Sequence, residues 1–268
     1  MNGGKRMDLK LTGKNALVVA SSQGLGKAIA QKLVEEGANV MITGRNENKL
    51  KHVADELMKL NKGGKISFCE TDITKPEQVK QMVSKVVQEF GTIDILLNNA
   101  GGPPAGTFMD LSDEDWQNSF ELNLLSYVRI IREVYPYMKE QGGRILNMAS
   151  ISVKEPIQGL LLSNTFRLGI AGLTKTLATE FAKDQILINA IAPGVISTDR
   201  ITYLDEKTAE RQGLSVQEVK ENAEKQIPLG RYGEPEEFAN YAVFLLSTIN
   251  TYVTGQVLLV DGGKVKGI

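Results

Sequence analysis

Short apolar runs alternate with longer amphipathic stretches along almost the whole chain. The runs are rich in β-branched and small residues, which is typical of strands buried on both faces. The longer stretches repeat apolar residues at helical spacing. We expect strands at 15–20, 39–43, 65–70, 93–98, 144–149, 186–192 and 256–260, and helices at 24–36, 46–60, 76–90, 112–138, 160–182 and 235–246. This alternation predicts an α/β chain with a doubly wound parallel sheet of about seven strands and helices on both faces.

One stretch, 194–227, departs from this alternation. It is polar, contains two charged segments with helical spacing, and lies between the sixth expected strand and the last expected helix. Excursions of this length inside a compact domain are usually functional. We therefore expect a single domain over residues 1–268, in which 194–227 forms a lid over a substrate.

Composition and charge narrow the classes of function. The net charge is −1, so no basic footprint for nucleic acid or an anionic membrane is predicted. No apolar run approaches the ~20 residues of a membrane span, and residues 1–7 lack the apolar core of a signal peptide. Cys69, at the end of an expected buried strand, and His52 are the only residues of their types, so no disulfide, metal site or histidine-based triad is predicted. We expect a cytoplasmic protein that acts on a small molecule.

A glycine-containing turn follows the first expected strand and opens the first expected helix. Its residues are Ser21, Ser22, Gln23, Gly24, Leu25 and Gly26. Glycines here let the backbone approach a pyrophosphate, whose negative charge the N-terminus of the helix stabilises. A tight turn without a ligand has the same local pattern. The strand before the turn and the helix after it are the context that a dinucleotide site requires, so the sequence favours such a site.

Further motifs occur at the ends of expected strands and within one expected helix. They are Asp72-Ile73, Asn98-Asn99-Ala100-Gly101, Asn123 and Pro193-Gly194. Together with the glycine turn they resemble the short-chain dehydrogenase/reductase family over residues 9–263, although Ala20 stands where the family has its first glycine. The resemblance implies a Rossmann-type fold, a nicotinamide dinucleotide and a homodimer or homotetramer. It also implies cofactor contacts from residues 21–26 and from Asp72, Ile73, Asn99, Ala100, Gly101, Pro193, Gly194 and Ile196.

The end of the second expected strand bears on the choice of cofactor. Proteins that select the unphosphorylated cofactor usually carry an acid there, which binds the ribose 2′-hydroxyl. Here Arg45 follows Gly44, and a guanidinium can donate several hydrogen bonds to a 2′-phosphate. Ser21 and Ser22 could add hydroxyl groups. Arg45 could also be a solvated residue at a helix start, but the pattern favours NADP(H) over NAD(H).

The catalytic positions depart from the family. The resemblance implies a serine followed by a Tyr-x-x-x-Lys pair, in which the tyrosine transfers the proton and the lysine binds the nicotinamide ribose. Alignment of both flanks puts Ser150 at the serine, Ser163 at the tyrosine and Arg167 at the lysine. A serine is a poor general acid without a base. Arg167 can bind ribose hydroxyls, but it cannot release a proton.

Two interpretations follow from this departure. In the first, hydride transfer continues at a carbonyl or a conjugated enone, with Ser150, Ser163 and Asn123 as hydrogen-bond donors to the developing negative charge. Lys154 is a nearby cation, and Tyr203 in the lid is a further candidate acid. A tyrosine-less branch of the family, represented by a reductase of the bacilysin pathway, is similar at 154–156 and 198–200. In the second, the chain binds NADP(H) without turnover, as a sensor or a partner subunit.

Overall fold

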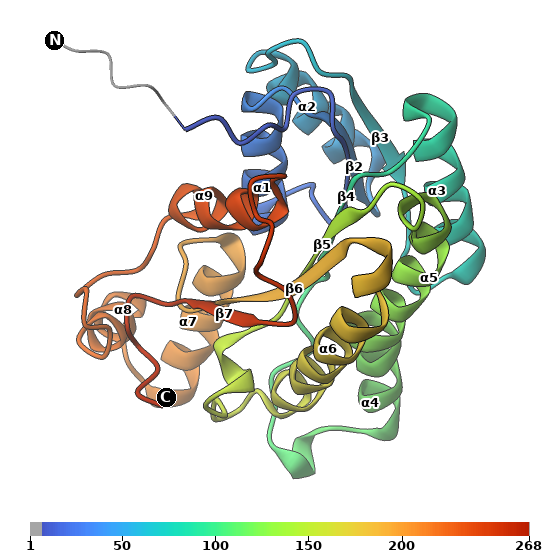
Figure 1. Ribbon diagram of the computed structural model, residues 1–268. Coiled ribbons are helices and arrows are strands. Elements are labelled where there is room, and N and C mark those ends of the chain that lie inside the picture. The colour runs from blue at the N-terminus through green and yellow to red at the C-terminus, as the bar shows by residue number, and fades with distance from the viewer. Residues whose placement is uncertain (1–6, 268) are drawn as a thin grey trace, which may run out of the picture.

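A single parallel sheet runs through the centre of the computed structural model, which describes residues 7–267 (Figure 1). The expectation about a signal peptide in 1–7 falls almost wholly outside this range. The strands are β1 Asn15–Val18, β2 Asn39–Gly44, β3 Ile66–Glu70, β4 Ile95–Asn98, β5 Gly143–Met148, β6 Ile186–Pro193 and β7 Val257–Val260. Their order is β3-β2-β1-β4-β5-β6-β7 and every neighbouring pair is parallel. The predicted doubly wound sheet of seven strands is confirmed.

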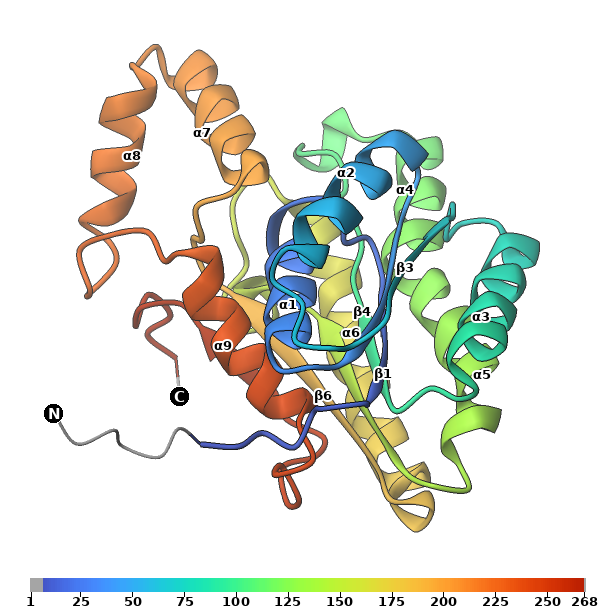
Figure 2. The same cartoon turned by 90° about the horizontal axis from the view of Figure 1, so that it is seen from above.

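Helices cover both faces of the sheet (Figure 2). One layer holds α1 Gly24–Glu35, α2 Glu47–Met58 and α9 Pro235–Leu246, and the other holds α3 Pro76–Phe90, α5 Ser126–Met138 and α6 Leu161–Glu180. Side chains alternate along a strand. Ala16 and Val18 of β1 therefore pack into the first layer, and Leu17 packs into the second. The fold thus has two apolar cores, one on each face of the sheet.

Burial differs between the centre and the edges of the sheet. Every residue of β1 and β4 is buried, as expected for strands with helices on both faces. The expectation of full burial is wrong for β3 and β7, in which no residue is fully buried and Glu70 at the end of β3 is exposed. These two are the edge strands, so each has a neighbour on one side alone. Cys69 in β3 is accordingly a half-buried free thiol.

The expected helix 112–138 is interrupted. It consists of α4 Asp113–Phe120, a π-helical turn Glu121–Leu125, and α5. The start follows the sequence, since the Ser112 hydroxyl accepts a hydrogen bond from the Asp115 amide. The expectation of one uninterrupted helix is wrong at the π turn, where an extra residue changes the direction of the side chains. Asn123 lies in this turn and is fully buried.

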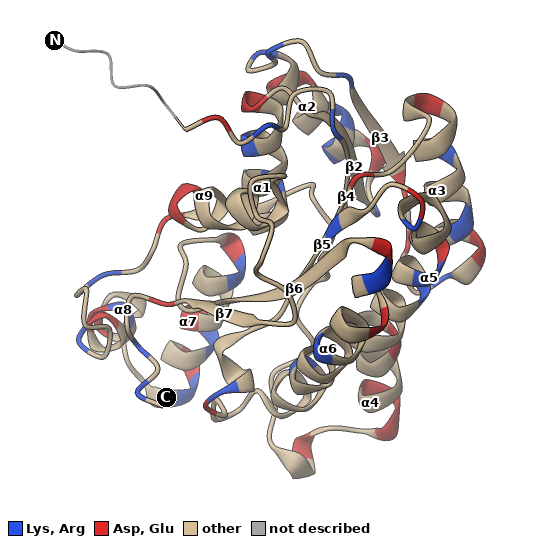
Figure 3. Ribbon diagram, in the orientation of Figure 1, with Lys and Arg blue, Asp and Glu red and all other residues tan. Residues whose placement is uncertain are grey.

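The polar stretch after β6 forms α7 Asp199–Gln212 and α8 Val216–Glu224, as its two charged segments predict. Both helices lie outside the two layers, beyond the carboxyl ends of the strands (Figures 1 and 2). Basic and acidic residues are interspersed on α3, α7 and α8 (Figure 3). No helix in the described range is long and apolar enough to cross a membrane. The order of the strands reverses between β1 and β4, and ligands of doubly wound sheets bind at such a point.

Candidate cofactor and substrate pocket

The glycine turn joins β1 to α1 at the point where the strand order reverses. The Ser21 amide donates to the Thr43 carbonyl at 2.8 Å, and the Ala20 amide donates to the Thr43 hydroxyl at 3.2 Å. Helix α1 then begins at Gly24, and its N-cap Gln23 makes no side-chain capping bond. The first N–H groups of α1 therefore have no side-chain acceptor and can bind an anion.

Gly26 shows why the turn needs a residue without a side chain. A Cβ atom at this position would lie 2.6 Å from the Ala20 carbonyl oxygen and 2.8 Å from Asn99 Nδ2. These two atoms form a hydrogen bond of 3.0 Å, which ties the end of β4 to the turn. The space that a Cβ would fill is thus occupied by a contact that shapes the turn.

Ala20 has a φ angle of +50°, in the left-handed region. This conformation costs a non-glycine residue about 1–2 kcal/mol, and the greater freedom of glycine in the unfolded chain offsets about 0.5–1 kcal/mol of that. Ala20→Gly is therefore expected to raise the free energy of unfolding by about 0.5–1 kcal/mol, measured by urea titration. Ala16→Gly in the extended strand β1 is the control and should lower it. A loss of stability in Ala20→Gly would show that the methyl group contributes more than the strain costs.

The Ser21 hydroxyl is bonded inside the protein, which corrects the expectation that it contacts the cofactor. The side chain is fully buried. Its hydroxyl donates to the Val18 carbonyl at 2.7 Å and accepts from the Thr43 amide at 3.0 Å. Its only donor is thus used inside the protein, so Ser21 supports the turn.

A cavity of about 760 Å³ extends from the glycine turn along the carboxyl ends of the strands. It brings together most of the residues expected to bind the cofactor, namely Ser22, Gln23, Gly24, Leu25, Arg45, Asp72, Ile73, Asn99, Ala100, Gly101, Arg167, Pro193, Gly194 and Ile196. Gly26 is buried behind this lining. Thr198, Asp199 and Ile201 of the expected lid also line the cavity, as do Lys49 and Thr71, to which the sequence did not point.

One end of the cavity is lined by Arg45, Lys49 and Asp72. The Lys49 ammonium donates to Gln23 Oε1 at 3.4 Å. Burial alone would raise the pKa of the Asp72 carboxyl, but hydrogen bonds from the Thr74 hydroxyl and amide, with Lys75 and Arg45 nearby, bring that pKa below its usual value. Asp72 is therefore an anion with a fixed orientation beside two basic side chains.

Arg167 lies near the other end and is 5% exposed. Its Nη1 donates to the Met148 carbonyl at 2.7 Å and to the Tyr127 hydroxyl at 3.0 Å, and its Nη2 donates to the Ala100 carbonyl at 3.5 Å. All three acceptors are neutral. The guanidinium thus contributes a positive charge to the cavity wall.

Sequence reasoning did not identify Tyr127 as a partner of Arg167. Its ring is fully buried, and its hydroxyl donates to the Met148 carbonyl at 3.1 Å. Burial raises the pKa of the Tyr127 phenol, although Arg167 opposes the shift. Tyr127 does not line the cavity and is a weak acid, so it cannot take the place of the family's tyrosine.

None of the three residues predicted as hydrogen-bond donors, Asn123, Ser150 and Ser163, lines the cavity. The fully buried Asn123 donates from Nδ2 to the Gly101 carbonyl at 2.7 Å. This corrects the expectation that Asn123 donates a hydrogen bond directly to the substrate, because its amide instead supports the loop after β4. The Ser150 hydroxyl accepts from the Ser152 amide at 3.2 Å, one residue beyond the lining residue Ala149. Ser163 lies one turn before Arg167 on α6, outside the lining.

The start of α7 closes this end of the cavity. Arg200 and Tyr203 line it, and their side chains stack with the guanidinium carbon 5.6 Å from the ring centre. Arg200 Nη2 also donates to the Pro103 carbonyl at 3.0 Å, which joins α7 to the loop after β4. Lys154, the other cation suggested by the sequence, is exposed and outside the lining.

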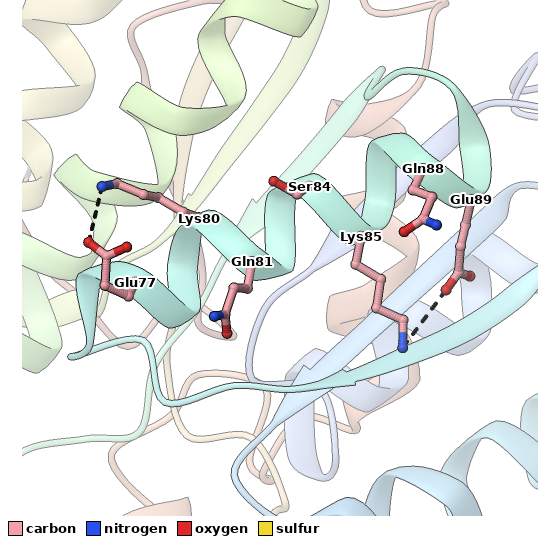
Figure 4. Close-up of a pocket in the computed structure, with 7 residues that line it drawn as sticks. All are labelled: Glu77, Lys80, Gln81, Ser84, Lys85, Gln88 and Glu89. Atoms are coloured by element: carbon pink, nitrogen blue, oxygen red, sulfur yellow. Dashed lines mark hydrogen bonds and ion pairs between the residues drawn. The ribbon is translucent and has the colours of Figure 1, made fainter.

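A second hollow lies on the outer face of α3 (Figure 4). It is lined by Glu77, Lys80, Gln81, Ser84, Lys85, Gln88 and Glu89, all from this one helix. Lys80 pairs with Glu77 at 3.1 Å and Lys85 pairs with Glu89 at 3.8 Å. These are neutralised surface pairs without convergent polar groups, so this hollow is a solvated helix face.

Comparison with known proteins places this geometry in a family. A family model described as enoyl-(acyl carrier protein) reductase matches residues 19–264. The chain belongs to the short-chain dehydrogenase/reductase family. Among its relatives, the 3-oxoacyl-[acyl-carrier-protein] reductase FabG of Aquifex aeolicus is 37% identical over 259 residues, 96% of this chain and 99% of the relative. Dehydrogenase/reductase SDR family member 4 of Caenorhabditis elegans is 35% identical over 259 residues, 95% and 96% of the two chains.

Solved structures of this family share the fold. L-sorbose reductase from Gluconobacter frateurii, complexed with NADPH and L-sorbose, is 34% identical with a TM-score of 0.92, over 98% of this chain and 100% of the other. YwfH, an NADPH-dependent reductase involved in bacilysin biosynthesis, is 28% identical with a TM-score of 0.91, over 95% and 99%. The predicted single-domain Rossmann fold is thereby confirmed.

Proposed function

We propose that the chain is an NADP(H)-dependent oxidoreductase that transfers a hydride to or from a carbonyl or a conjugated enone. The observation that carries this proposal is the buried Arg167 guanidinium, which faces the cavity from the position expected for the family's lysine. The free amides at the start of α1 supply a site for phosphate. L-sorbose reductase and YwfH are both described with NADPH, which supports the phosphorylated cofactor.

The proposed contacts divide the cavity. Arg45 and Lys49 bind the 2′-phosphate, and Asp72 and Ile73 contact the adenine. The pyrophosphate lies on Ser22, Gln23, Gly24 and Leu25. The nicotinamide half lies against Asn99, Ala100, Gly101, Arg167, Pro193, Gly194 and Ile196, with the segment 194–227 as a lid. When bound, the nicotinamide supplies or accepts the hydride.

The chemistry proposed for this chain does not need a tyrosine. Reduction of an enone at its far carbon leaves a delocalised enolate, and water can protonate this enolate later. Arg167 lines the cavity, and its three acceptors inside the protein are neutral. Its positive charge is therefore available to stabilise the negative charge of the enolate. We propose that Ser163 and Arg167 stand in place of the family's tyrosine and lysine, and that Ser150 and Asn123 orient the loops around them.

A second candidate is a sensor or partner subunit that binds NADP(H) without turnover. The shortage of proton donors around the cavity favours it. The hydroxyl of Tyr127 is committed to Met148, and Ser163 lies outside the lining. Among the described lining residues, Tyr203 is then the sole phenol that could supply a proton.

The test begins with NADPH binding, followed by fluorescence titration. NADPH oxidation is then measured against a panel of ketones and enones. We expect enone reduction by the wild type and a loss of about 100-fold or more in Arg167→Ala. Arg144→Gln, a half-buried arginine at the amino end of β5, is the control. The double variant Ser163→Tyr with Arg167→Lys should gain ordinary ketone reduction. Binding without turnover of either class would establish the second candidate, and failure to bind NADPH would contradict both.

A further inference from the structure

Two arginines from different helices contribute positive charge to the same part of the cavity. Arg167 comes from α6, and Arg200 comes from the first turn of α7. Within residues 7–267, the arginines that form ion pairs are Arg129 and Arg231. Neither Arg167 nor Arg200 has an acidic partner in that range. No carboxylate of the described residues therefore neutralises either positive charge through an ion pair.

The hydrogen bonds of Arg200 leave part of its guanidinium available. Nη2 donates to the Pro103 carbonyl, one face stacks on Tyr203, and the edge packs against Gly102. Nε and Nη1 have no partner among the described residues. The N–H groups of Arg200 that have no partner in the described protein can donate a charge-assisted hydrogen bond to an anion such as a carboxylate.

The cost of this arrangement favours an anionic ligand. Burial lowers the pKa of Arg200, and the nearby charge of Arg167 lowers it further while Tyr203 opposes the shift. Two like charges that share a half-buried cavity repel each other, and an anion between them would relieve the repulsion. The acids that line the cavity do not fill this role, since Asp72 is bonded to Thr74 and Asp199 is exposed.

The cofactor already has other partners for its phosphates. The N-terminus of α1 is available to the pyrophosphate, and Arg45 with Lys49 is available to the 2′-phosphate. The charge at Arg200 is thus in excess of what the cofactor requires. The remaining anion is expected to come from the molecule that is reduced or oxidised.

We propose that the substrate carries a carboxylate, which binds Arg200 at the end of the cavity shared with Arg167. This inference rests on the proposed NADP(H)-dependent function and names its substrate class as an oxo acid or an enone acid. Arg200 orients the substrate by a charge-assisted hydrogen bond from an N–H group that is not used inside the protein. Arg167 then lies beside the carbonyl, where it can stabilise an enolate.

The experiment compares acids with their uncharged methyl esters. The probes are levulinate and methyl levulinate as ketones, and trans-acetylacrylate and its methyl ester as enones. In the wild type we expect kcat/KM for the acid to exceed that for the ester by about tenfold or more. Arg200→Gln should abolish this preference, whereas Arg200→Lys, which keeps the charge, should retain it. Arg144→Gln is the matched control and should behave as the wild type.

A binding measurement separates this inference from the proposed function. The same acids and esters are titrated calorimetrically into the complex with NADP⁺. If no probe is turned over but the acids bind more tightly than the esters and lose that advantage in Arg200→Gln, the proposed function fails and the anion site stands. Equal behaviour of acids and esters in both assays, or no binding of either at millimolar concentration, would overturn the inference.

Arg200 could instead bind a phosphate of the cofactor, and the affinity for NADPH tests this alternative. The Kd of NADPH is expected to be the same in the wild type and in Arg200→Gln. A weaker NADPH complex with an unchanged acid preference would assign Arg200 to the pyrophosphate and overturn the inference. A preference for acids that survives Arg200→Gln would do so as well, because the charge would then be met elsewhere.

Discussion

The double variant Arg45→Ala with Lys49→Ala is expected to bind NADPH about 100-fold or more weakly, while its affinity for NADH stays unchanged. The two side chains line one end of the cavity, next to Asp72 and on the loop and helix that follow β2. Each can donate charge-assisted hydrogen bonds to a 2′-phosphate, worth about 1.5–3 kcal/mol apiece. Because both side chains are exposed, the NADPH affinity of the wild type should also fall as salt is raised.

Lys51→Ala is the control for this experiment. Lys51 lies on the same helix, two residues after Lys49, and pairs with Glu47 at 3.0 Å outside the cavity lining. Its removal should change neither affinity. Equal losses for NADPH and NADH in the double variant would contradict the assignment of the 2′-phosphate to this end of the cavity.

The positions of the helices and strands were predictable where the spacing of apolar residues along the chain directly reflects which side chains are buried. Helices α3 and α9 begin and end at the predicted residues. Both have a proline in the first turn, Pro76 and Pro235, where the missing N–H costs little. The partial burial of β3 and β7 was not predictable, because edge position depends on the order of the strands and not on the local pattern.

The π turn Glu121–Leu125 also could not be predicted from the local sequence pattern. Its residues are compatible with an ordinary α-helix, and the extra residue is linked to a tertiary contact. Asn123 reaches the Gly101 carbonyl, 22 residues away in the sequence. Residues 112–138 alone therefore predict a helix but not its interruption.

The same distinction applies to the pocket. The cofactor half was predictable, because a glycine turn between a strand and a helix is a local motif with a known ligand chemistry. The substrate half depends on distant contacts. Arg200 is placed by Pro103, 97 residues earlier, and Tyr127 meets Arg167 across 40 residues. Alignment could place Arg167 at the family's lysine, but it could not show that its acceptors are neutral.

Gly26→Ala is expected to lower the free energy of unfolding by about 1–3 kcal/mol and to weaken NADPH binding strongly. The new Cβ would overlap the Ala20 carbonyl, which is backbone and cannot rotate away. Relief of that overlap would break the Asn99–Ala20 hydrogen bond and shift the amides at the start of α1. Stability is measured by urea titration, and binding by fluorescence of the NADPH complex.

Gly172→Ala is the matched control, since Gly172 also lies in a helix but a Cβ there would meet no atom within 4 Å. Alanine at an exposed helix position should raise the free energy of unfolding by about 0.5–1 kcal/mol. The opposite signs of the two changes isolate the effect of the close approach from that of helix propensity. If Gly26→Ala kept both the stability and the NADPH affinity of the wild type, the turn would have room to move, and the cofactor site would not depend on the contact between β1 and β4. If Gly26→Ala lost stability but kept its affinity for NADPH, Gly26 would be required for the fold and not for cofactor binding.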